Sequence, residues 1–343
     1  DDVFNLNGDF GGTVNGDAGD DAFNLNANQS GQFNGGEGSD TFTLADGVVL
    51  SFAGTAIDGG ADAAGDDDDE LNVAADAGAL AVSLTASAAD TGFTGTEATV
   101  FTGAGGQFAG IDTVTGSGDE TLTGTTATST WTETSYDDGT ETLAFSGVAT
   151  AIGNAASDTL VGGSGVDTFT VDGAGSVTLG SQDFDGMDTL NGQGNDDVFN
   201  LNADFGGTVN GDAGDDTFNL TASQTGLVDG GADGANGDVI NGAATENLFI
   251  VSSENGGTAN GTTFANVENL TGGAAADEFR FAAGGSLAGS VDGAGGTDEL
   301  DVAGAAAVTV TLGDSSATVL NSGAANGFSS IETFTGNGTT DVL

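Results

Sequence analysis

The chain has 343 residues, of which 63 are Gly, 53 are Asp or Glu and one is Arg, and it contains no Lys, His, Cys or Pro. A formal charge of -52 excludes binding to nucleic acids and to anionic membrane surfaces, because both need Lys or Arg. No apolar run approaches the roughly 18 residues that a membrane-spanning helix requires, so divalent cations are the partners that this composition favours.

Short strands of alternating polarity are predicted from the start of the chain onward. They read AFNLN (22–26), TFTL (41–44) and AVSLTA (81–86), and each is bounded by Gly, Asn or Asp. Such strands also occur in antiparallel sandwiches. The return of Phe4, Phe23 and Phe42 every 19 residues favours a parallel β-solenoid, because one coil then brings the same residue type back to the same place.

A longer repeat relates two distant parts of the chain. Residues 1–25 and 196–220 differ only at Gly8/Ala203 and Ala22/Thr217. This duplication predicts one continuous repetitive β-solenoid over residues 1–343, itself a fragment of a longer repeat array.

A looser repeat places an acid four residues after a Phe. Its members are Phe93 with Glu97, Phe108 with Asp112, Phe184 with Asp188, Phe264 with Glu268, and Phe328 with Glu332. The clearest examples are FANVENLTG and FSSIETFTG.

An aspartate lies two residues before each Phe of the 19-residue series. Stacked at the strand spacing of about 4.8 Å, Asp2, Asp21 and Asp40 would repel one another by about 3–4 kcal/mol per pair at an effective dielectric constant near 20. A bound cation would replace this repulsion with a net attraction between the ion and the carboxylates. Without His or Cys the chain cannot form typical zinc, copper or iron–sulfur sites, whereas carboxylates and turn carbonyls suit Ca²⁺.

The turns before these strands follow the pattern G-G-x-G-x-D-x-U-x, where U is apolar. Full matches are GGEGSDTFT (35–43) and GGSGVDTFT (162–170). Degenerate matches begin at residues 16, 153, 192, 211, 272 and 293. The pattern resembles the calcium-binding nonapeptide of RTX proteins, and the surrounding text resembles giant repetitive surface adhesins of Gram-negative bacteria.

The resemblance implies an all-β fold, a parallel β-solenoid of the β-roll or β-helix type, with Ca²⁺ bound in its Gly/Asp turns. Its implied calcium ligands are Asp21, Asp40, Asp158, Asp167, Asp197, Asp216, Asp277 and Asp298, with Asp2 and Asp188 matching less of the motif. Nonapeptides follow one another directly only in 153–170 and 183–200, so we expect a wider, less regular solenoid with calcium at some turns.

Several residues have two interpretations. Asp could occupy these turns through its turn preference alone. The run DDDDE (66–70) is either a solvated acidic loop or a metal site, and Trp131 and Tyr136 either stack on sugars or pack as a loop or cap. For Arg280, a salt bridge within an acidic surface is favoured over a functional cation.

The sequence as a whole predicts an extracellular or cell-surface structural protein of a Gram-negative bacterium. It would be stabilised by calcium, associate with itself into a filament or array, and form the rod of an adhesin, a matrix filament or a surface layer. Catalysis is not expected, since His, Cys and Lys are missing. The alternative is a polysaccharide-processing or carbohydrate-binding module that carries RTX repeats.

Overall fold

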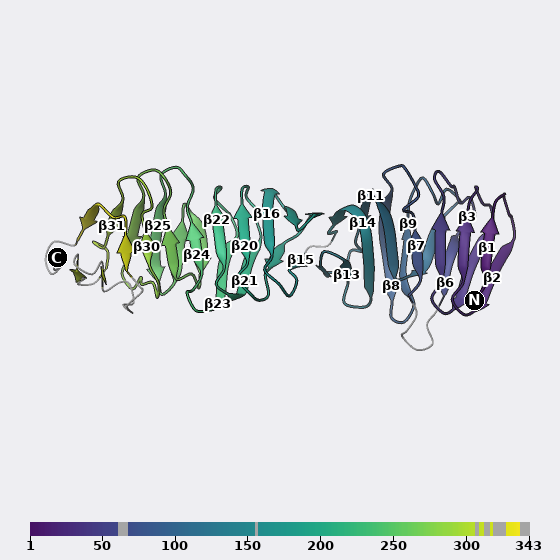
Figure 1. Ribbon diagram of the computed structural model, residues 1–343, viewed down its shortest axis with the longest axis horizontal. Helices are drawn as coiled ribbons and strands as arrows, with labels where there is room; N and C mark the ends of the chain where they lie inside the picture. Colours follow the sequence, from purple (N-terminus) through teal and green to yellow (C-terminus); the bar gives the residue numbers. More distant parts are fainter. Residues whose placement is uncertain (61–67, 155–156, 306–308, 312–315, 318–326, 337–343) are drawn as a thin grey trace. The chain divides into compact units, whose positions relative to one another are not determined.

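In the computed structural model, β-strands are the only regular secondary structure of the residues that it describes, and turns and loops join them (Figure 1). It describes residues 1–60, 68–154, 157–305, 309–311, 316–317 and 327–336. Among these residues no helix is long and apolar enough to cross a membrane. Contacts divide the chain into two compact units, each described by itself: unit 1 is Asp1–Thr159 with Gln182–Met187, and unit 2 is Leu160–Ser181 with Asp188–Leu343.

Two columns of stacked parallel strands organise unit 1. Its strands are β1 (Val3–Leu6), β2 (Thr13–Ala18), β3 (Ala22–Leu25), β4 (Gln32–Glu37), β5 (Thr41–Leu44), β6 (Thr55–Gly60), β7 (Glu70–Asn72), β8 (Ala81–Ala88), β9 (Gly92–Thr96), β10 (Gln107–Ile111), β11 (Thr113–Thr123), β12 (Ser129–Trp131), β13 (Ser135–Asp137), β14 (Thr142–Ile152) and β18 (Gln182–Asp185). The first column stacks β1, β3, β5, β7, β11 and β14. The second stacks β2, β4, β6 and β10.

Unit 2 repeats this arrangement with three parallel columns. Its strands are β16 (Thr168–Gly173), β17 (Ser176–Leu179), β19 (Thr189–Asn191), β20 (Val198–Leu201), β21 (Thr208–Gly214), β22 (Thr217–Leu220), β23 (Leu227–Asp233), β24 (Val239–Asn241), β25 (Leu248–Ser253), β26 (Gly256–Ala259), β27 (Thr262–Ala265), β28 (Asn269–Thr271), β29 (Glu278–Phe281), β30 (Val291–Asp292), β31 (Glu299–Asp301), β32 (Val310–Thr311), β33 (Ser316–Ala317), β34 (Phe328–Ser329) and β35 (Thr333–Thr335); β15 (Asp158–Val161) contains the division between the units. One column runs from β16 through β20, β22, β24, β28 and β30 to β34. The others stack β19, β21, β23 and β27, and β25, β29, β31 and β35.

Stacked phenylalanines fill the interior of the columns. Phe23 lies between Phe4 and Phe42, with ring centroids 4.8 and 4.7 Å apart, because the strands pair 19 residues apart in parallel register. In unit 2, Phe199 lies between Phe169 and Phe218 at 4.8 and 5.1 Å. Each buried ring contributes about 1.5–3 kcal/mol through the removal of apolar surface from water.

The internal repeat also preserves a buried polar contact. Gln29 and Gln224, which are 195 residues apart, are both buried. The side-chain carbonyl of Gln29 accepts the N–H of Phe10 at 3.0 Å, and that of Gln224 accepts the N–H of Phe205 at 2.8 Å. The two repeats therefore share a structural corner beyond their matching 25 residues.

The expected all-β fold and parallel stacking are confirmed, and the arrangement is solenoid-like. Antiparallel hairpins interrupt it: β8, β9 and β10 pair in sequence, as do β12, β13 and β14, and β25, β26 and β27. These hairpins account for the irregular spacing of the motifs, because each inserts residues between successive coils.

Candidate metal centre

In unit 1, the Gly-rich corner after a second-column strand ends on an acid whose side chain is turned inward. The backbone N–H of Asp21 donates to Oδ1 of Asp40 at 2.7 Å, and that of Asp40 donates to Oδ1 of Asp69 at 2.8 Å. The N–H of Asp69 donates to Oδ2 of Asp112 at 3.2 Å, and Asp2 donates to Asp21 in the same manner. We name this series of five acids the unit 1 ladder.

Unit 2 contains two further ladders. Ladder A consists of Asp167, Asp197, Asp216, Asp238 and Glu268, and ladder B consists of Asn247, Asp277, Asp298 and Glu332. In each ladder, the backbone N–H of every residue except the last donates to the side chain of the next residue at 2.7 to 2.9 Å. A hydrogen bond from N–H to a carboxylate is favourable, so each coil offsets part of the repulsion between its stacked acids.

A glycine five residues before the acid makes room for the carboxylate. At Gly211, an added Cβ would lie 2.2 Å from Oδ2 of Asp216 and 2.5 Å from the carbonyl oxygen of Gly230 in the next coil. At Gly35, it would lie 1.8 Å from Oδ2 of Asp40. The first position of the nonapeptide pattern therefore requires glycine, because the carboxylate of the acid leaves no room for a side chain there.

The second carboxylate oxygen of several ladder acids has no hydrogen-bond donor. In the described part of the chain, Oδ2 is buried without a hydrogen-bond partner in Asp21, Asp167, Asp197, Asp216, Asp238 and Asp298. Burial raises the pKa of Asp197 and of Asp238 to about 7, and that of Asp216 to about 6. These oxygens therefore favour a proton or a cation as their neighbour.

Asn247 occupies a ladder position with an amide in place of a carboxylate. Its side-chain amino group donates to the carbonyl oxygens of Ala243 and Thr245 in the same corner, at 2.9 and 2.8 Å. The corner thus offers carbonyl acceptors to the side chain at this position. A carboxylate can use such acceptors only through a proton or a metal ion.

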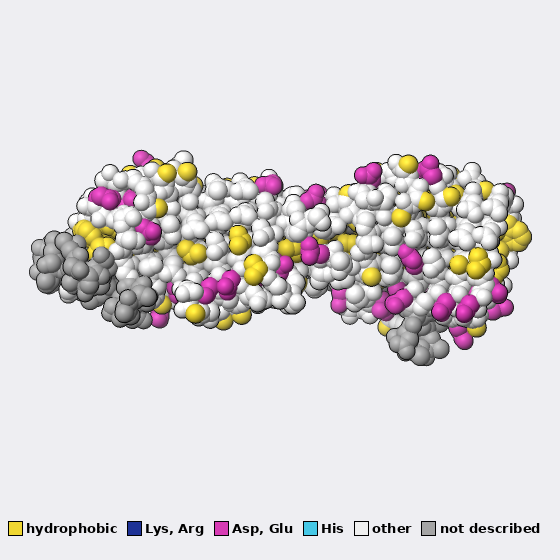
Figure 2. Space-filling view, in the orientation of Figure 1, with side chains coloured by type: hydrophobic (Ala, Val, Ile, Leu, Met, Phe, Trp, Pro, Cys, Tyr) yellow, Lys and Arg dark blue, Asp and Glu magenta, His cyan; other side chains and the backbone are white. Residues whose placement is uncertain are grey.

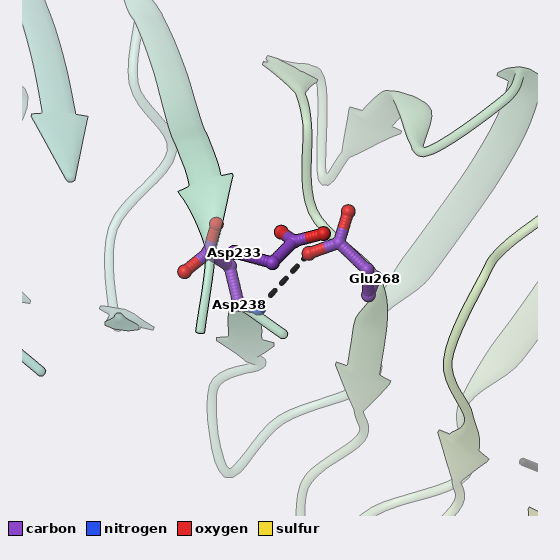
Figure 3. Close-up of side chains that lie close together, drawn as sticks. All are labelled: Asp233, Asp238 and Glu268. Atoms are coloured by element: carbon purple, nitrogen blue, oxygen red, sulfur yellow. Dashed lines mark hydrogen bonds between the residues drawn. The ribbon is translucent and has the colours of Figure 1, made fainter. Parts of the chain in front are cut away.

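Three acids come together where ladder A ends. Asp233, Asp238 and Glu268 each place a carboxylate oxygen within 4.8 Å of the other two. Figure 3 shows Asp233 and Glu268 directed toward one another, and the N–H of Asp238 donates to Oε2 of Glu268 at 2.9 Å. The corner from Gly230 to Asp238 is three residues longer than that from Gly211 to Asp216, and within it Asp233 lies opposite Gly214 of the previous coil.

The electrostatics of this acidic cluster suit a cation. Asp238 is fully buried, whereas Asp233 is exposed. Burial, reinforced by the neighbouring Asp233, raises the pKa of Glu268 to about 8, although the N–H of Asp238 opposes this rise. Three carboxylates form a hard oxygen donor set that could hold a metal ion.

The predicted calcium ligands occupy three kinds of environment. Asp21, Asp40, Asp158, Asp197, Asp216, Asp277 and Asp298 are buried, Asp167 is half-buried, and Asp2 and Asp188 are exposed. Of those outside the ladders, Asp158 accepts the hydroxyl of Ser129 at 2.5 Å, and the backbone carbonyl of Asp188 accepts the N–H of Thr208 at 3.1 Å. Their assignment as calcium ligands stays a prediction.

The ladders include five acids that the nonapeptide pattern missed. They are Asp69, Asp112, Asp238, Glu268 and Glu332. Each has an apolar residue two positions later, and this signal could have found them.

Three of these acids come from the looser Phe repeat and define a short corner. Asp112, Glu268 and Glu332 each lie four residues after a Phe. The residue midway between the Phe and the acid has a positive φ, which is 65° at Gly110, 51° at Asn266 and 53° at Ser330. The short corner therefore places an acid at the ladder position without the glycine loop, once in each of the three ladders.

The remaining sequence candidates pack as structural residues. Trp131 and Tyr136 are fully buried, so neither presents a ring to a sugar. Arg280 forms ion pairs with Glu278 and, at 3.3 Å, with Asp301. Of the DDDDE run, positions 66 and 67 lie outside the described residues, and Asp69 belongs to the unit 1 ladder.

Comparison with known proteins adds no family to this description. No protein-family model matches the chain, and no curated protein or solved structure shows significant similarity to it.

Proposed function

We propose that this chain is an extracellular structural repeat protein whose fold is stabilised by calcium, and that it serves in an adhesin, a matrix filament or a surface layer. The observation that carries the proposal is the set of ladders, in which acids stack and Oδ2 is buried without a hydrogen-bond donor in six of them: Asp21, Asp167, Asp197, Asp216, Asp238 and Asp298. Acidic side chains also spread over the visible faces of both units, without basic side chains among them (Figure 2).

The acidic cluster is the best candidate for a calcium site. Asp233, Asp238 and Glu268 would hold the ion with carboxylate oxygens, and the metal would supply the positive charge that the chain lacks. Asp233 is exposed, so ions can reach the cluster from solvent. Ions that bind the folded chain, at a hundredfold excess over the dissociation constant, stabilise it by about 2.7 kcal/mol per site.

An extracellular location follows from the same physics. Extracellular calcium sites have dissociation constants of about 10⁻⁴–10⁻³ M, which cytosolic calcium would leave empty. A chain of charge -52 would then resist compaction inside the cell and fold after export.

The direct test is thermal unfolding, followed by circular dichroism, in EGTA and in CaCl₂ at constant ionic strength. We expect calcium to raise the midpoint temperature, and Asp233→Asn to reduce that rise because it removes one ligand. Asp233 is exposed, so the variant should fold normally in EGTA. Glu246→Gln, another exposed acid of unit 2, is the matched control and should behave like the wild type.

Equal midpoints in EGTA and calcium would overturn the calcium mechanism. A calcium effect that survives Asp233→Asn unchanged would leave the mechanism standing but move the site away from the acidic cluster.

A further inference from the structure

The long corner of ladder A, residues 230–238, connects two members of the acidic cluster. Asp233 ends β23 and Asp238 directly precedes β24, so only residues 234–237 lie between the two acids. The separation of their carboxylates therefore depends on the conformation of four residues. A free loop of this length would have to be ordered each time an ion binds, and the cost of ordering it would weaken the binding.

The carboxylate of Asp215, in the preceding coil, accepts four hydrogen bonds from this segment. Its Oδ1 accepts the backbone N–H of Asn236 at 2.9 Å and that of Gly237 at 2.7 Å. Its Oδ2 accepts the N–H of Ala235 at 3.2 Å and the side-chain amino group of Asn236 at 2.9 Å. A Cβ at Gly234 would lie 2.8 Å from Oδ1 of Asp215, so the segment fits closely around the carboxylate.

The outer acids of other corners make fewer contacts of this kind. Among the described residues, Oδ1 of Asp196 accepts the N–H of Asp215 at 2.9 Å, and Oδ1 of Asp20 accepts the N–H of Ser39 at 3.1 Å. Both acids lie directly before a ladder acid, as Asp215 does. The larger set of hydrogen bonds thus occurs opposite the corner that contains Asp233.

Asn269, in the following coil, holds the carbonyl groups of the same segment. Its side-chain amino group donates at 3.0, 3.3 and 3.1 Å to the carbonyl oxygens of Asn236, Gly237 and Asp238. Its side-chain oxygen accepts the N–H of Ser290 at 2.9 Å, which fixes the orientation of the amide. The segment is therefore held by its N–H groups on one side and by its carbonyl groups on the other.

We propose that Asp215 and Asn269 are positioning residues for the cation site, and that they hold the long corner in the conformation that brings the acidic cluster around one ion. This assignment rests on the calcium site proposed above and adds the residues that set its affinity. Neither side chain belongs to the acidic cluster. Residues that orient metal ligands without touching the metal commonly contribute about 10–100-fold to its affinity.

The same two residues should also set the preference of the site for one ion over another. Ca²⁺ accepts longer distances to its oxygens than Mg²⁺, which requires a compact octahedron. Carboxylates on a corner that is held from both sides close less readily around the smaller ion. Loss of either positioning residue should therefore reduce the selectivity for Ca²⁺ over Mg²⁺, an effect that a residue needed only for stability does not produce.

Calcium titration of the full chain by isothermal calorimetry tests this role. The cluster is the binding component that Asp233→Asn weakens or removes. Asp215→Ala removes all four contacts and should weaken that component about 10–100-fold. Asp215→Asn keeps one oxygen that can accept the N–H groups of Asn236 and Gly237, so its loss should be smaller. Asn269→Ala changes no charge and should also weaken the binding of calcium.

Asp212→Asn is the matched control for charge. Asp212 lies in the same corner as Asp215, and asparagine tolerates its positive φ of 71°. The variant removes one negative charge but leaves the four contacts of Asp215 in place, so calcium affinity should fall far less than in Asp215→Ala. Equal losses in the two variants would show that charge alone is responsible, and would overturn the positioning role.

Hydrogen exchange in EGTA tests the hold on the corner without metal. The amides of residues 235–237 should exchange more slowly in the wild type than in Asp215→Ala, whereas those of β22 should stay protected in both and show that unit 2 is folded. Unchanged exchange at residues 235–237 would overturn the role of Asp215.

The two measurements separate the possible failures. Faster exchange in Asp215→Ala with unchanged calcium affinity would overturn the positioning role and leave the calcium site standing. A wild-type chain without a calcium component that depends on Asp233 would overturn the calcium site itself, and the positioning role with it, whatever the exchange shows.

Discussion

At the scale of single residues, the main feature is a carboxylate directed into the coil. Asp216 accepts the N–H of Asp197, and its other oxygen packs against Gly211. Aspartate suits this place because it is short enough to fit between two coils and can accept a backbone N–H. In the short corners, where the glycine loop is absent, Glu268 and Glu332 reach the same position with a longer side chain.

Filling the glycine space should destabilise the fold. For Gly211→Ala, whose Cβ would lie 2.2 Å from Asp216, we expect a loss of about 1–3 kcal/mol in the free energy of unfolding by urea. Gly165→Ala is the control, because nothing lies within 4 Å of its added Cβ. Equal losses in the two variants would show that the close approach at Gly211 is not limiting.

The buried acids also predict a pH dependence in the absence of metal. The pKa values of Asp197 and Asp238, about 7, and of Asp216, about 6, are raised by burial above the usual 3.8. The folded chain therefore binds more protons than the unfolded chain, and stability present below about pH 4 is lost as the pH rises toward 7.

In EGTA, we expect the free energy of unfolding to be higher at pH 5 than at pH 8 by at least about 2 kcal/mol, as measured by urea denaturation at each pH. Asp216→Asn, which removes one titrating group, should reduce the difference. Greater stability at pH 8 in EGTA would contradict the raised pKa values.

At the scale of elements, the columns are held by stacked side chains. The same residue type occurs at the end of a column as Phe4 and in the middle of a column as Phe199. The second has a ring on each side and is fully buried, and the first has a ring on one side only.

These two positions allow a matched comparison. Phe199→Ala should lower the free energy of unfolding by about 3–5 kcal/mol, because a cavity forms between two rings. Phe4→Ala should cost about half as much or less, since solvent can fill the space it leaves. Chemical denaturation of both variants tests this, and a cost at Phe4 equal to that at Phe199 would contradict the difference in burial between the two positions.

At the scale of the whole molecule, the charge of -52 opposes compaction everywhere. Monovalent salt screens this repulsion over distances beyond about 10 Å at 0.1 M. The carboxylates within the ladders and within the acidic cluster lie closer together than this distance and are partly buried, so salt screens their repulsion less.

We therefore expect NaCl to raise the midpoint of thermal unfolding gradually, and CaCl₂ at the same ionic strength to raise it further. The additional rise measures binding at sites, as opposed to screening. Identical midpoints for the two salts at matched ionic strength would indicate that calcium acts only as a screening ion.

The local sequence pattern alone determined many of the strands and much of their stacking. Alternating short runs such as TFTL predict strands, and the 19-residue return of Phe4, Phe23 and Phe42 predicts their stacking, because these signals lie within a few residues or repeat at a fixed interval. The Gly and Asp of the corners that match the nonapeptide pattern were also found in this way.

Only the tertiary structure decided what each carboxylate contacts. The partner of Asp21 lies 19 residues away, but that of Asp69 lies 43 residues away beyond a hairpin, and no fixed interval predicts it. The acidic cluster likewise unites Asp233 with Glu268 across two corners of different length. Strand formation depends on neighbouring residues in the sequence. The contact partner of a buried acid instead depends on which segment forms the next coil, and only the tertiary structure determines that segment.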